Sequence, residues 1–390
     1  MANRDRGNAE AGRGHYLAIY VEPTPYILGL LRKINEIADK PLITLFIGED
    51  VSQAWRLSLE DSMASVLSPR RTEALAQLWR GIAARPDVVH LAGWGHPLLL
   101  FAIVVAALLR VPVAMESDTQ LPIDAPAWKR LIKAIIYPWL FRIPAVLLPG
   151  GSRQRAYFRH YGVPERKIVN AQMTVDVRQI RERCRQMGPA TRISIRQQLG
   201  IGRSDFVFIY VGRLEPYKGV ADLLEAFDRI CNNVPELALL IVGDGSEARR
   251  VKDATLRNPR VRWAGRLGQK EAIEMLHAAD VAVLPSRRDA WGLVVNEAMA
   301  AGLPVVASDR VGAVDDLVIN GRTGVVYRSG DVAMLASEME TLSRDLARRD
   351  RLAAGAGALI AEWSLEASAS ITVAAWKGSR RRHHGPWMSP

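Results

Sequence analysis

The chain has 390 residues, with 52 Lys or Arg against 41 Asp or Glu, so its formal net charge is +11. This length predicts two domains, and fractions of 49% hydrophobic and 24% charged residues exclude wholesale disorder. The two cysteines, Cys184 and Cys231, exclude a disulfide framework and a cysteine zinc site, and they favour a reducing, cytoplasmic compartment.

In the first half of the chain, short apolar runs alternate with stretches of helical period. Residues 1–14 are polar and lack the apolar core of a signal peptide, so we expect a flexible leader. The stretch Pro97–Leu109 is shorter than the roughly 20 apolar residues that cross a bilayer, which predicts a buried helix. The predicted strands are Tyr16–Val21, Leu42–Ile47, Val88–Ala92, Val111–Met115 and Ala145–Leu148, with helices such as Ile27–Ala38 and Arg71–Ala84 between them.

The second half repeats this alternation. Its strands are almost continuously apolar, as expected where both faces of a parallel sheet are covered, and we place them at Phe206–Val211, Ala238–Val242, Val261–Ala264, Val281–Pro285 and Val305–Ala307. A doubly wound α/β layer is therefore expected twice. The predicted division is a first domain at 15–170, a linker at 171–204, a second domain at 205–345, and a carboxy-terminal helix with a solvated basic tail at 346–390.

The loop after the first strand of the second half combines cations with glycines. Open α/β sheets bind ligands outside the carboxyl ends of their strands, and this loop contains Gly212, Arg213, Lys218 and Gly219 just before a helix. Arg can hold a phosphate with two hydrogen bonds, Lys adds a point charge, and a helix start offers free N–H groups. A turn with two surface cations is the equally weighted alternative.

The loop after Val281–Pro285 contains two acids eight positions apart, Asp289 and Glu297. Gly292 is predicted to begin a helix, so Asp289 precedes that helix and Glu297 lies on it. Acids at these two levels can accept hydrogen bonds from hydroxyls on two parts of one ligand, while the N–H groups of Gly292 and Leu293 face an anionic group between them. The alternative is an N-capping Asp and an exposed helical Glu.

From Val207 to Val326 the sequence resembles the donor-binding half of the family 4 retaining glycosyltransferases. The matching stretches follow one another in the family's order, over about a third of the chain. They are Tyr210-Val211-Gly212-Arg213 with Lys218-Gly219, Ile241-Val242-Gly243-Asp244-Gly245, Ala278-Ala279-Asp280-Val281 leading to Pro285-Ser286, Asp289-Ala290-Trp291-Gly292-Leu293 with Glu297-Ala298-Met299, Gly302-Leu303-Pro304-Val305-Val306-Ala307, and Asn320-Gly321-Arg322-Thr323-Gly324.

The resemblance implies the α/β fold called GT-B, in which two Rossmann-like doubly wound parallel-sheet domains face a central cleft. It implies catalytic roles for Arg213 and Lys218, on the donor diphosphate, and for Asp289, on the donor sugar. The implied donor-binding residues are Gly212, Trp291, Gly292 and Leu293, together with Arg266 and Leu267 beside the base and Glu297 on the ribose hydroxyls. The family usually has Glu at position 289, and its usual Gly-Gly turn is here Gly312-Ala313, with Asp316 following.

The first half departs further from the family pattern. Glu22-Pro23-Thr24-Pro25-Tyr26 stands where many members have a glycine-rich loop, and Glu116-Ser117-Asp118 stands where many have a His, similar to the Glu-Ser variant of polysaccharide-assembly members. The acceptor-side candidates are Tyr26, Trp94, Glu116, Ser117 and Asp118. For His90 and His96, which flank Gly93-Trp94-Gly95, we expect packing rather than catalysis.

The segment from Trp128 to Arg142 places cations among Trp, Leu and Ile residues at helical spacing. Such a helix could rest on an anionic membrane that presents a lipid-linked acceptor. A core helix with a basic outer face is the alternative of equal weight.

Together these features predict transfer of a sugar, with retained configuration, from a nucleotide diphosphate sugar of the UDP or GDP type to a saccharide or lipid-linked acceptor. The resemblance favours exopolysaccharide or lipopolysaccharide synthesis, in the cytoplasm or peripherally on the inner face of the membrane. We expect no cofactor and no metal ion, because no Asp-x-Asp motif stands out, and no nucleic-acid partner, because the cations are scattered or sit at strand–helix turns. The alternatives are another sugar-nucleotide enzyme of this fold, such as an epimerase, and a non-catalytic basic binding protein.

Overall fold

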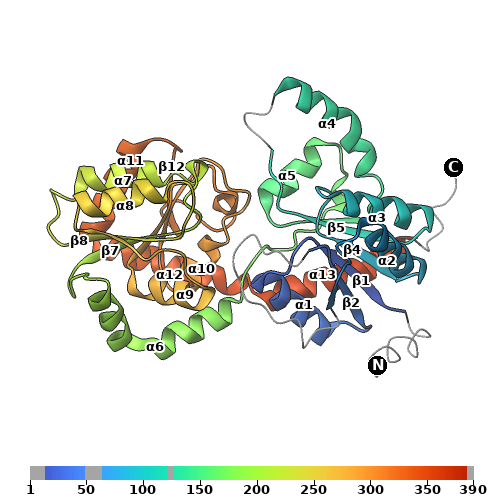
Figure 1. Ribbon diagram of the computed structural model, residues 1–390, viewed down its shortest axis with the longest axis horizontal. Coiled ribbons are helices and arrows are strands. Elements are labelled where there is room, and N and C mark those ends of the chain that lie inside the picture. Colours follow the sequence, from blue (N-terminus) through green and yellow to red (C-terminus); the bar gives the residue numbers. More distant parts are fainter. Residues whose placement is uncertain (1–13, 49–63, 122–125, 384–390) are drawn as a thin grey trace. The chain divides into compact units, whose positions relative to one another are not determined.

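A computed structural model describes residues 14–48, 64–121 and 126–383 of the chain. The chain divides into two compact units, here called unit 1 and unit 2 (Figure 1). Unit 1 is Met1–Met173 together with Leu365–Pro390, and unit 2 is Thr174–Ser364. The predicted leader at 1–14 lies, except for Gly14, outside the described residues, as do the last seven residues of the basic tail.

Unit 1 is built on a parallel sheet of six described strands in the order β3-β2-β1-β4-β5-β6. Five of the strands match the predicted runs to within about two residues at either end, and the short β3 was not predicted. The strands are β1 (Tyr16–Tyr20), β2 (Leu42–Phe46), β3 (Ala64–Val66), β4 (Val88–Leu91), β5 (Val113–Ser117) and β6 (Val146–Pro149). The helices are α1 (Pro25–Ile37), α2 (Arg71–Ala83), α3 (Pro97–Leu108), α4 (Ala127–Leu140), α5 (Ser152–His160), the 3-10 turn η1 (Glu165–Lys167) and α13 (Leu365–His383).

Both faces of this sheet are covered, which is why β1 is buried along its whole length. Leu17 and Ile19 point into one apolar core, shared with residues of α2, α3 and α5. Tyr16, Ala18 and Tyr20 point into the other, shared with α1 and α13. Helix α13 comes from the end of the chain and lies beside α1 (Figure 1), so the carboxy-terminal helix forms part of the core of unit 1.

Helix α3 corrects one expectation, because it is not a buried helix. Leu99, Ala102 and Ile103 are buried, but Leu100, Val104 and Leu108 are 41%, 53% and 72% exposed. The exposed residues are four apart and therefore share one face of the helix. An almost uniformly apolar sequence gives no sign of which side packs against the sheet. Within the described residues, no helix is long and apolar enough to span a membrane.

Unit 2 contains a second parallel sheet of six described strands, in the order β12-β11-β10-β7-β8-β9. The strands are β7 (Phe206–Val211), β8 (Leu237–Val242), β9 (Val261–Trp263), β10 (Val281–Leu284), β11 (Val305–Ser308) and β12 (Gly324–Tyr327). The helices are α6 (Val177–Gln198), α7 (Val220–Ile230), α8 (Ala248–Arg257), α9 (Gln269–Ala278), α10 (Val294–Ala300), α11 (Val332–Arg344) and α12 (Leu346–Glu362), with 3-10 turns η2 (Pro216–Lys218) and η3 (Gly312–Asp315).

The strand order of each sheet has one point at which the chain changes direction along the sheet. This point lies between β1 and β4 in unit 1 and between β7 and β10 in unit 2. The loops that leave the carboxyl ends of such neighbouring strands diverge to opposite faces and open a crevice, where doubly wound sheets bind their ligands. The loops after β7 and β10 contain the predicted catalytic residues Arg213, Lys218 and Asp289, so the topology brings these three to one edge.

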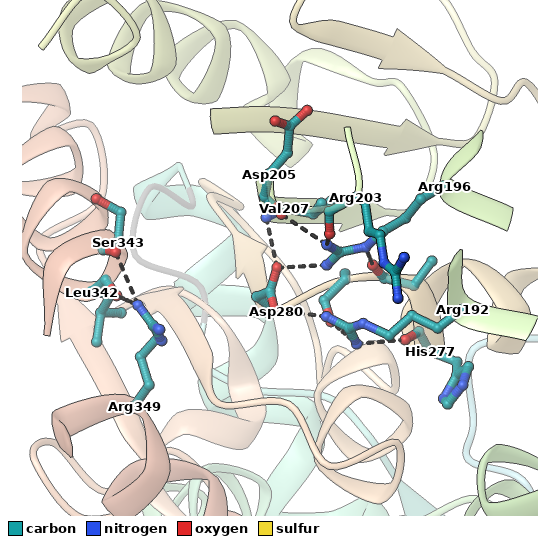
Figure 2. A network of polar contacts seen from close by, with 12 residues as sticks. Arg192, Arg196, Arg203, Asp205, Val207, His277, Asp280, Leu342, Ser343 and Arg349 are labelled. Carbon is teal, nitrogen blue, oxygen red and sulfur yellow. Dashed lines mark hydrogen bonds and ion pairs between the residues drawn. The ribbon is translucent and has the colours of Figure 1, made fainter. Parts of the chain in front are cut away.

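A network of hydrogen bonds from two arginines connects α6 to the amino ends of strands β7 and β10 in unit 2 (Figure 2). Helix α6 occupies the predicted linker and bends at Gly188, where φ is 62°. Asp280, directly before β10, accepts hydrogen bonds from Arg192 at 2.7 Å, from Arg196 at 2.8 Å, and from the main-chain N–H of Val207 at 2.8 Å. Arg196 is 5% exposed, so its charge depends on Asp280 for compensation.

We predict that Asp280→Ala lowers the free energy of unfolding by about 3 kcal/mol, because it leaves the buried Arg196 charge without its partner. Urea-induced unfolding followed by circular dichroism measures the loss. The matched control is Glu225→Ala, which breaks the exposed Glu225–Arg229 pair on α7 and should cost less than about 0.5 kcal/mol. Equal losses in the two variants would contradict the assignment.

Candidate active site

The loop after β7 is held in place by contacts that only glycine permits. Gly219 has φ of 74°, and a Cβ atom there would lie 2.1 Å from the carbonyl oxygen of Pro285, at the end of β10. A Cβ atom at Gly243 would lie 1.8 Å from the carbonyl oxygen of Gly212. These close approaches pack the loops of β7, β8 and β10 against one another, and they explain the glycines of the predicted motifs.

Lys218 and Asp289, two predicted catalytic residues, form an ion pair. The Lys218 Nζ lies 2.7 Å from Asp289 Oδ2, and both side chains are half-buried with 15% exposure. The pair joins the end of η2 to the loop after β10. Burial and the nearby Asp289 carboxylate together raise the pKa of the Tyr210 hydroxyl above its ordinary value. Tyr210 therefore remains a donor, and its hydroxyl donates to the carbonyl oxygen of Arg213 at 2.7 Å.

Three cations surround the ring of Tyr217. The guanidinium carbons of Arg213 and Arg288 lie 5.7 and 5.4 Å from the ring centroid, and Lys218 Nζ lies 5.7 Å from it. The carbonyl oxygen of Tyr217 accepts from the main-chain N–H of both Arg287 and Arg288. We refer to Arg213, Lys218 and Arg288 as the cation cluster. Arg213 and Lys218 are predicted from the sequence, whereas Arg288 is not, although it is adjacent to Asp289 in the chain.

Arg287, next to Arg288, has a different role. Its guanidinium donates to both carboxylate oxygens of the buried Asp222 on α7, at 3.0 and 2.8 Å. These hydrogen bonds raise the pKa of Arg287, so it stays charged. Two adjacent arginines thus divide the work: Arg287 fixes the loop to α7, whereas the exposed Arg288 adds charge to the cluster.

The turn after β11 supports the loop that contains Asp289. Asp289 forms an isolated parallel bridge with Val311, and the N–H of Gly312 donates to the Asp289 carbonyl at 3.1 Å. A Cβ atom at Gly312 would lie 1.9 Å from the carbonyl oxygen of Ala290. The second position of this turn needs no glycine, because Ala313 is accommodated and its N–H donates to the Trp291 carbonyl at 2.9 Å.

The ring of Trp291, a predicted donor-binding residue, lies inside unit 2. It is 2% exposed, it stacks on Trp363 with ring centroids 5.5 Å apart, and its Nε1 donates to Asn296 at 2.9 Å. Only the main chain of Trp291 is therefore placed to reach a ligand. The ring anchors the loop from beneath.

The helix that begins near Gly292 is short, because α10 covers only Val294–Ala300. The N–H groups of Gly292 and Leu293 donate no hydrogen bond within the described residues. Glu297, half-buried on α10, likewise makes no side-chain hydrogen bond or ion pair there. Burial raises the pKa of Glu297 to about 7. This edge of the sheet thus offers unpaired donors at the helix start and one carboxylate poised to ionise near neutral pH.

Arg266 and Leu267 lie in the loop between β9 and α9, and β9 is two strands away from β7 in the sheet. Arg266 is exposed and lies 4.0 Å from Asp244, which is also exposed. They share the carboxyl edge of the sheet with the cation cluster but make no contact with it. In the described residues, no group of three or more His, Cys, Asp or Glu side chains could hold a metal ion.

The acceptor-side candidates of unit 1 fall into two groups. Glu116 and Ser117 end β5, next to β4, and Tyr26 begins α1; the Glu116 carboxylate, after burial, is the main cause that raises the pKa of Tyr26. Asp118 follows in the loop, where its carbonyl accepts from Gln154 at 3.1 Å. Trp94, by contrast, packs edge-on against Phe141, with centroids 4.9 Å apart, and belongs to an aromatic cluster with Tyr137, Tyr157 and Phe158.

His90 and His96 both make side-chain hydrogen bonds. His96 caps α3, where its Nδ1 accepts from the N–H of Leu98 at 3.2 Å. His90 is 2% exposed, but both of its ring nitrogens are hydrogen-bonded, one of them to Glu116. The sequence pattern gave no sign of this contact, since the two residues are 26 positions apart.

Residues 191–357 match the family model described as "Glycosyl transferases group 1". The chain is 31% identical over 353 residues to a glycogen synthase of Mycobacterium tuberculosis, covering 86% of this chain and 78% of that protein. It is 29% identical over 352 residues to a D-inositol 3-phosphate glycosyltransferase of Streptomyces avermitilis, covering 80% and 72%. With a sulfoquinovosyl transferase of Arabidopsis thaliana it shares 26% identity, covering 86% and 68%.

Solved structures show the same fold. The Anabaena protein HepE, in complex with UDP and glucose, superposes with a TM-score of 0.75 and 18% identity, over 93% of this chain and all of that one. A sucrose-phosphate synthase of Thermosynechococcus elongatus gives 0.70 and 18% identity, over 93% and 98%. The predicted fold class, GT-B with two Rossmann-like domains, is confirmed. By its sequence, this chain belongs to the group 1 glycosyl transferases.

Proposed function

We propose that this glycosyl transferase moves a sugar, with retained anomeric configuration, from a nucleotide diphosphate sugar to a lipid-linked saccharide acceptor at an anionic membrane. The observation that carries the donor half is the cation cluster around Tyr217, together with the N–H groups of Gly292 and Leu293, which have no acceptor among the described residues. Polysaccharide or lipopolysaccharide assembly is the setting in which such acceptors occur.

The diphosphate becomes more negative as the bond to the sugar breaks, so fixed positive charge stabilises the transition state more than the bound substrate. Arg213 and Lys218 supply that charge, with Arg288 as a third cation. No metal ion is needed in this proposal, because the cations and the helix start take its electrostatic role. The UDP bound to HepE makes UDP the first nucleotide to test against GDP.

The Lys218–Asp289 ion pair indicates where the donor sugar would bind. When a diphosphate takes the positive charge of Lys218, the Asp289 carboxylate becomes available to accept hydrogen bonds from sugar hydroxyls. Glu297, which lies on α10 eight positions after Asp289, would accept hydrogen bonds from the ribose hydroxyls. Asp in place of the family's usual Glu shortens this reach by one methylene group, which bears on which sugar is preferred.

Helix α4 supports the membrane half of the proposal. None of its residues is fully buried, and Tyr137 and Leu140 are partly buried residues that pack against the core of unit 1. This exposure favours the membrane interpretation over a core helix. Its exposed apolar residues are spaced three and four apart on one stripe, with 47–66% exposure: Trp128, Leu131, Ile132, Ile135, Ile136 and Trp139. Two cations lie against its indole rings: Lys129 Nζ is 5.2 Å from the centroid of the Trp128 ring, and the guanidinium carbon of Arg142 is 4.3 Å from that of Trp139. Indole rings and cations bordering an apolar stripe suit the interface of an anionic membrane.

We predict that Arg213→Ala and Lys218→Ala each lower turnover by about 10²–10³, the effect of removing one main charge-stabilising donor. Release of UDP or GDP from the corresponding glucose donors, with and without EDTA, measures turnover. Arg249→Ala, which removes an exposed cation from α8, is the control and should leave turnover unchanged. Wild-type turnover in either site variant refutes the donor assignment, and loss of activity in EDTA refutes metal independence.

We predict that Glu297 makes the protein less stable as pH rises. The folded pKa of about 7 lies above the ordinary 4.5, so the folded state holds the proton more tightly than the unfolded chain. Stability is therefore lost between about pH 4.5 and 7 and is constant above. Glu297→Gln, which cannot ionise, should gain about 1–3 kcal/mol over the wild type across that interval. Urea-induced unfolding of both proteins at several pH values measures the difference. A difference in free energy of unfolding that stays the same from pH 4.5 to 7 would contradict this prediction.

We predict that the protein sediments with phosphatidylglycerol vesicles but not with phosphatidylcholine vesicles, and that the binding weakens as salt is added. Leu131→Ser with Ile135→Ser should reduce binding about tenfold by removing apolar area from the stripe. Leu256→Ser, at a 77% exposed apolar residue of unit 2, is the control. Equal binding by all three proteins would show that α4 does not contact the membrane.

A further inference from the structure

Four side chains of unit 1 form a hydrogen-bonded chain that ends on Glu116. The indole Nε1 of Trp376 donates to His90 Nδ1 at 3.2 Å. His90 Nε2 lies 3.1 Å from Glu116 Oε2 and 3.1 Å from the Tyr20 hydroxyl, which donates to Glu116 Oε2 at 3.4 Å. Trp376, His90 and Tyr20 are at most 2% exposed, whereas the Glu116 side chain is 28% exposed.

The sheet register brings these residues together. His90 on β4 is paired with Ala18 on β1 and Ala114 on β5. The two alanines leave room for the imidazole on the face that α13 covers. Tyr20 and Glu116 lie two residues further along their strands, on the same face and closer to the carboxyl edge. Trp376 reaches this place only because α13 returns to unit 1 from the end of the chain.

The indole N–H fixes where the proton of His90 lies. An indole can only donate a hydrogen bond, so His90 Nδ1 must accept and cannot hold a proton. The ring is therefore neutral, with its proton on Nε2, where it donates towards Glu116. The pKa of the Tyr20 hydroxyl is raised, chiefly by burial and then by the Glu116 charge, so Tyr20 also remains a donor to that carboxylate.

Both donors converge on a single carboxylate oxygen. Glu116 Oε2 is held from within the sheet, while Oε1 accepts no hydrogen bond within the described residues. The carboxylate is thus oriented from below, with one free oxygen at the half-exposed end of the chain of contacts. It lies beside the point between β1 and β4 where the unit 1 sheet changes direction, the place where such sheets bind ligands.

We propose that Trp376 and His90 are positioning residues, which orient Glu116 to accept a hydrogen bond from the acceptor hydroxyl through its free oxygen. This inference rests on the proposed function. Purely structural burial would be served better by apolar residues, because a buried polar chain is costly unless every member is satisfied. Here every buried member has a partner, and the oxygen that accepts no hydrogen bond within the described residues, Glu116 Oε1, is at the exposed end.

The first test is the tautomer of His90, read from imidazole ¹⁵N resonances of the full chain near pH 7, with His90→Gln identifying the signals. We expect a neutral ring with its proton on Nε2 in the wild type. In Trp376→Phe, which retains an aromatic ring but lacks the N–H, we expect these resonances to shift. A proton on Nδ1, or an imidazolium, in the wild type overturns the inference whether or not the protein shows transferase activity.

The second test is a double-mutant cycle on sugar transfer. Trp376→Phe and His90→Leu should each lower transfer about 5- to 100-fold, with the donor KM unchanged, and should cause no further loss when combined with Glu116→Gln. His90→Gln, whose amide can still donate to Glu116, should recover most of the activity that His90→Leu loses. Tyr16→Phe is the control, because Tyr16 packs on Trp376 with centroids 4.9 Å apart but bonds to Asp39 instead; it should leave transfer unchanged.

Two results would show that Trp376 and His90 only stabilise the fold. In the first, the loss of transfer in each variant adds fully to the loss caused by Glu116→Gln; in the second, the donor KM changes as much as the transfer rate. Absence of transfer by the wild type would instead refute the proposed function and with it the role of Glu116 towards an acceptor. The tautomer measurement would then decide only whether Trp376 and His90 orient Glu116.

Discussion

The ion pair between Lys218 and Asp289 is the contact on which the donor-side arrangement depends. It joins two loops that are 71 positions apart in the chain and that leave neighbouring strands on either side of the point where the sheet changes direction. Both groups are half-buried to the same extent, so each compensates the charge of the other without a full desolvation cost. The pair also keeps a cation and an acid at one place, ready for ligand groups of opposite character.

The framework beneath this pair is separate from the surface that would meet a ligand. Trp291 stacks on Trp363 in the interior, Arg287 clamps the loop to Asp222, and Gly219 and Gly312 allow close backbone contacts that any side chain would prevent. These residues hold the loops from below. Arg213 and Arg288 remain exposed above them, so their charge is available to a ligand. Rigid support combined with available charge is what a preorganised anion site requires.

The two units use the same sheet design for different chemistry. Both sheets have six described parallel strands and one change of direction. In unit 2 the corresponding edge displays cations and free N–H groups, which suit a diphosphate. In unit 1 it displays the Glu116 carboxylate with phenolic hydroxyls of Tyr20 and Tyr26 near it, which suit a neutral hydroxyl compound. The contrast follows from the side chains at the two edges and from the main-chain N–H groups of Gly292 and Leu293.

Apolar runs and strand-to-helix turns are local features, so they predict ten of the twelve described strands and the repeated α/β layer; β3 and β12 are not among them. The same features predict the loops that contain Arg213, Lys218 and Asp289 and the helix that contains Glu297. The partners of those residues follow from the tertiary fold. The pairing of Lys218 with Asp289, the third cation at Arg288, the burial of the Trp291 ring and the contact of Trp376 with His90 all join segments that lie apart in the chain or depend on which side of an element packs. The exposed face of α3 belongs here too, since a uniformly apolar helix does not indicate its packed side.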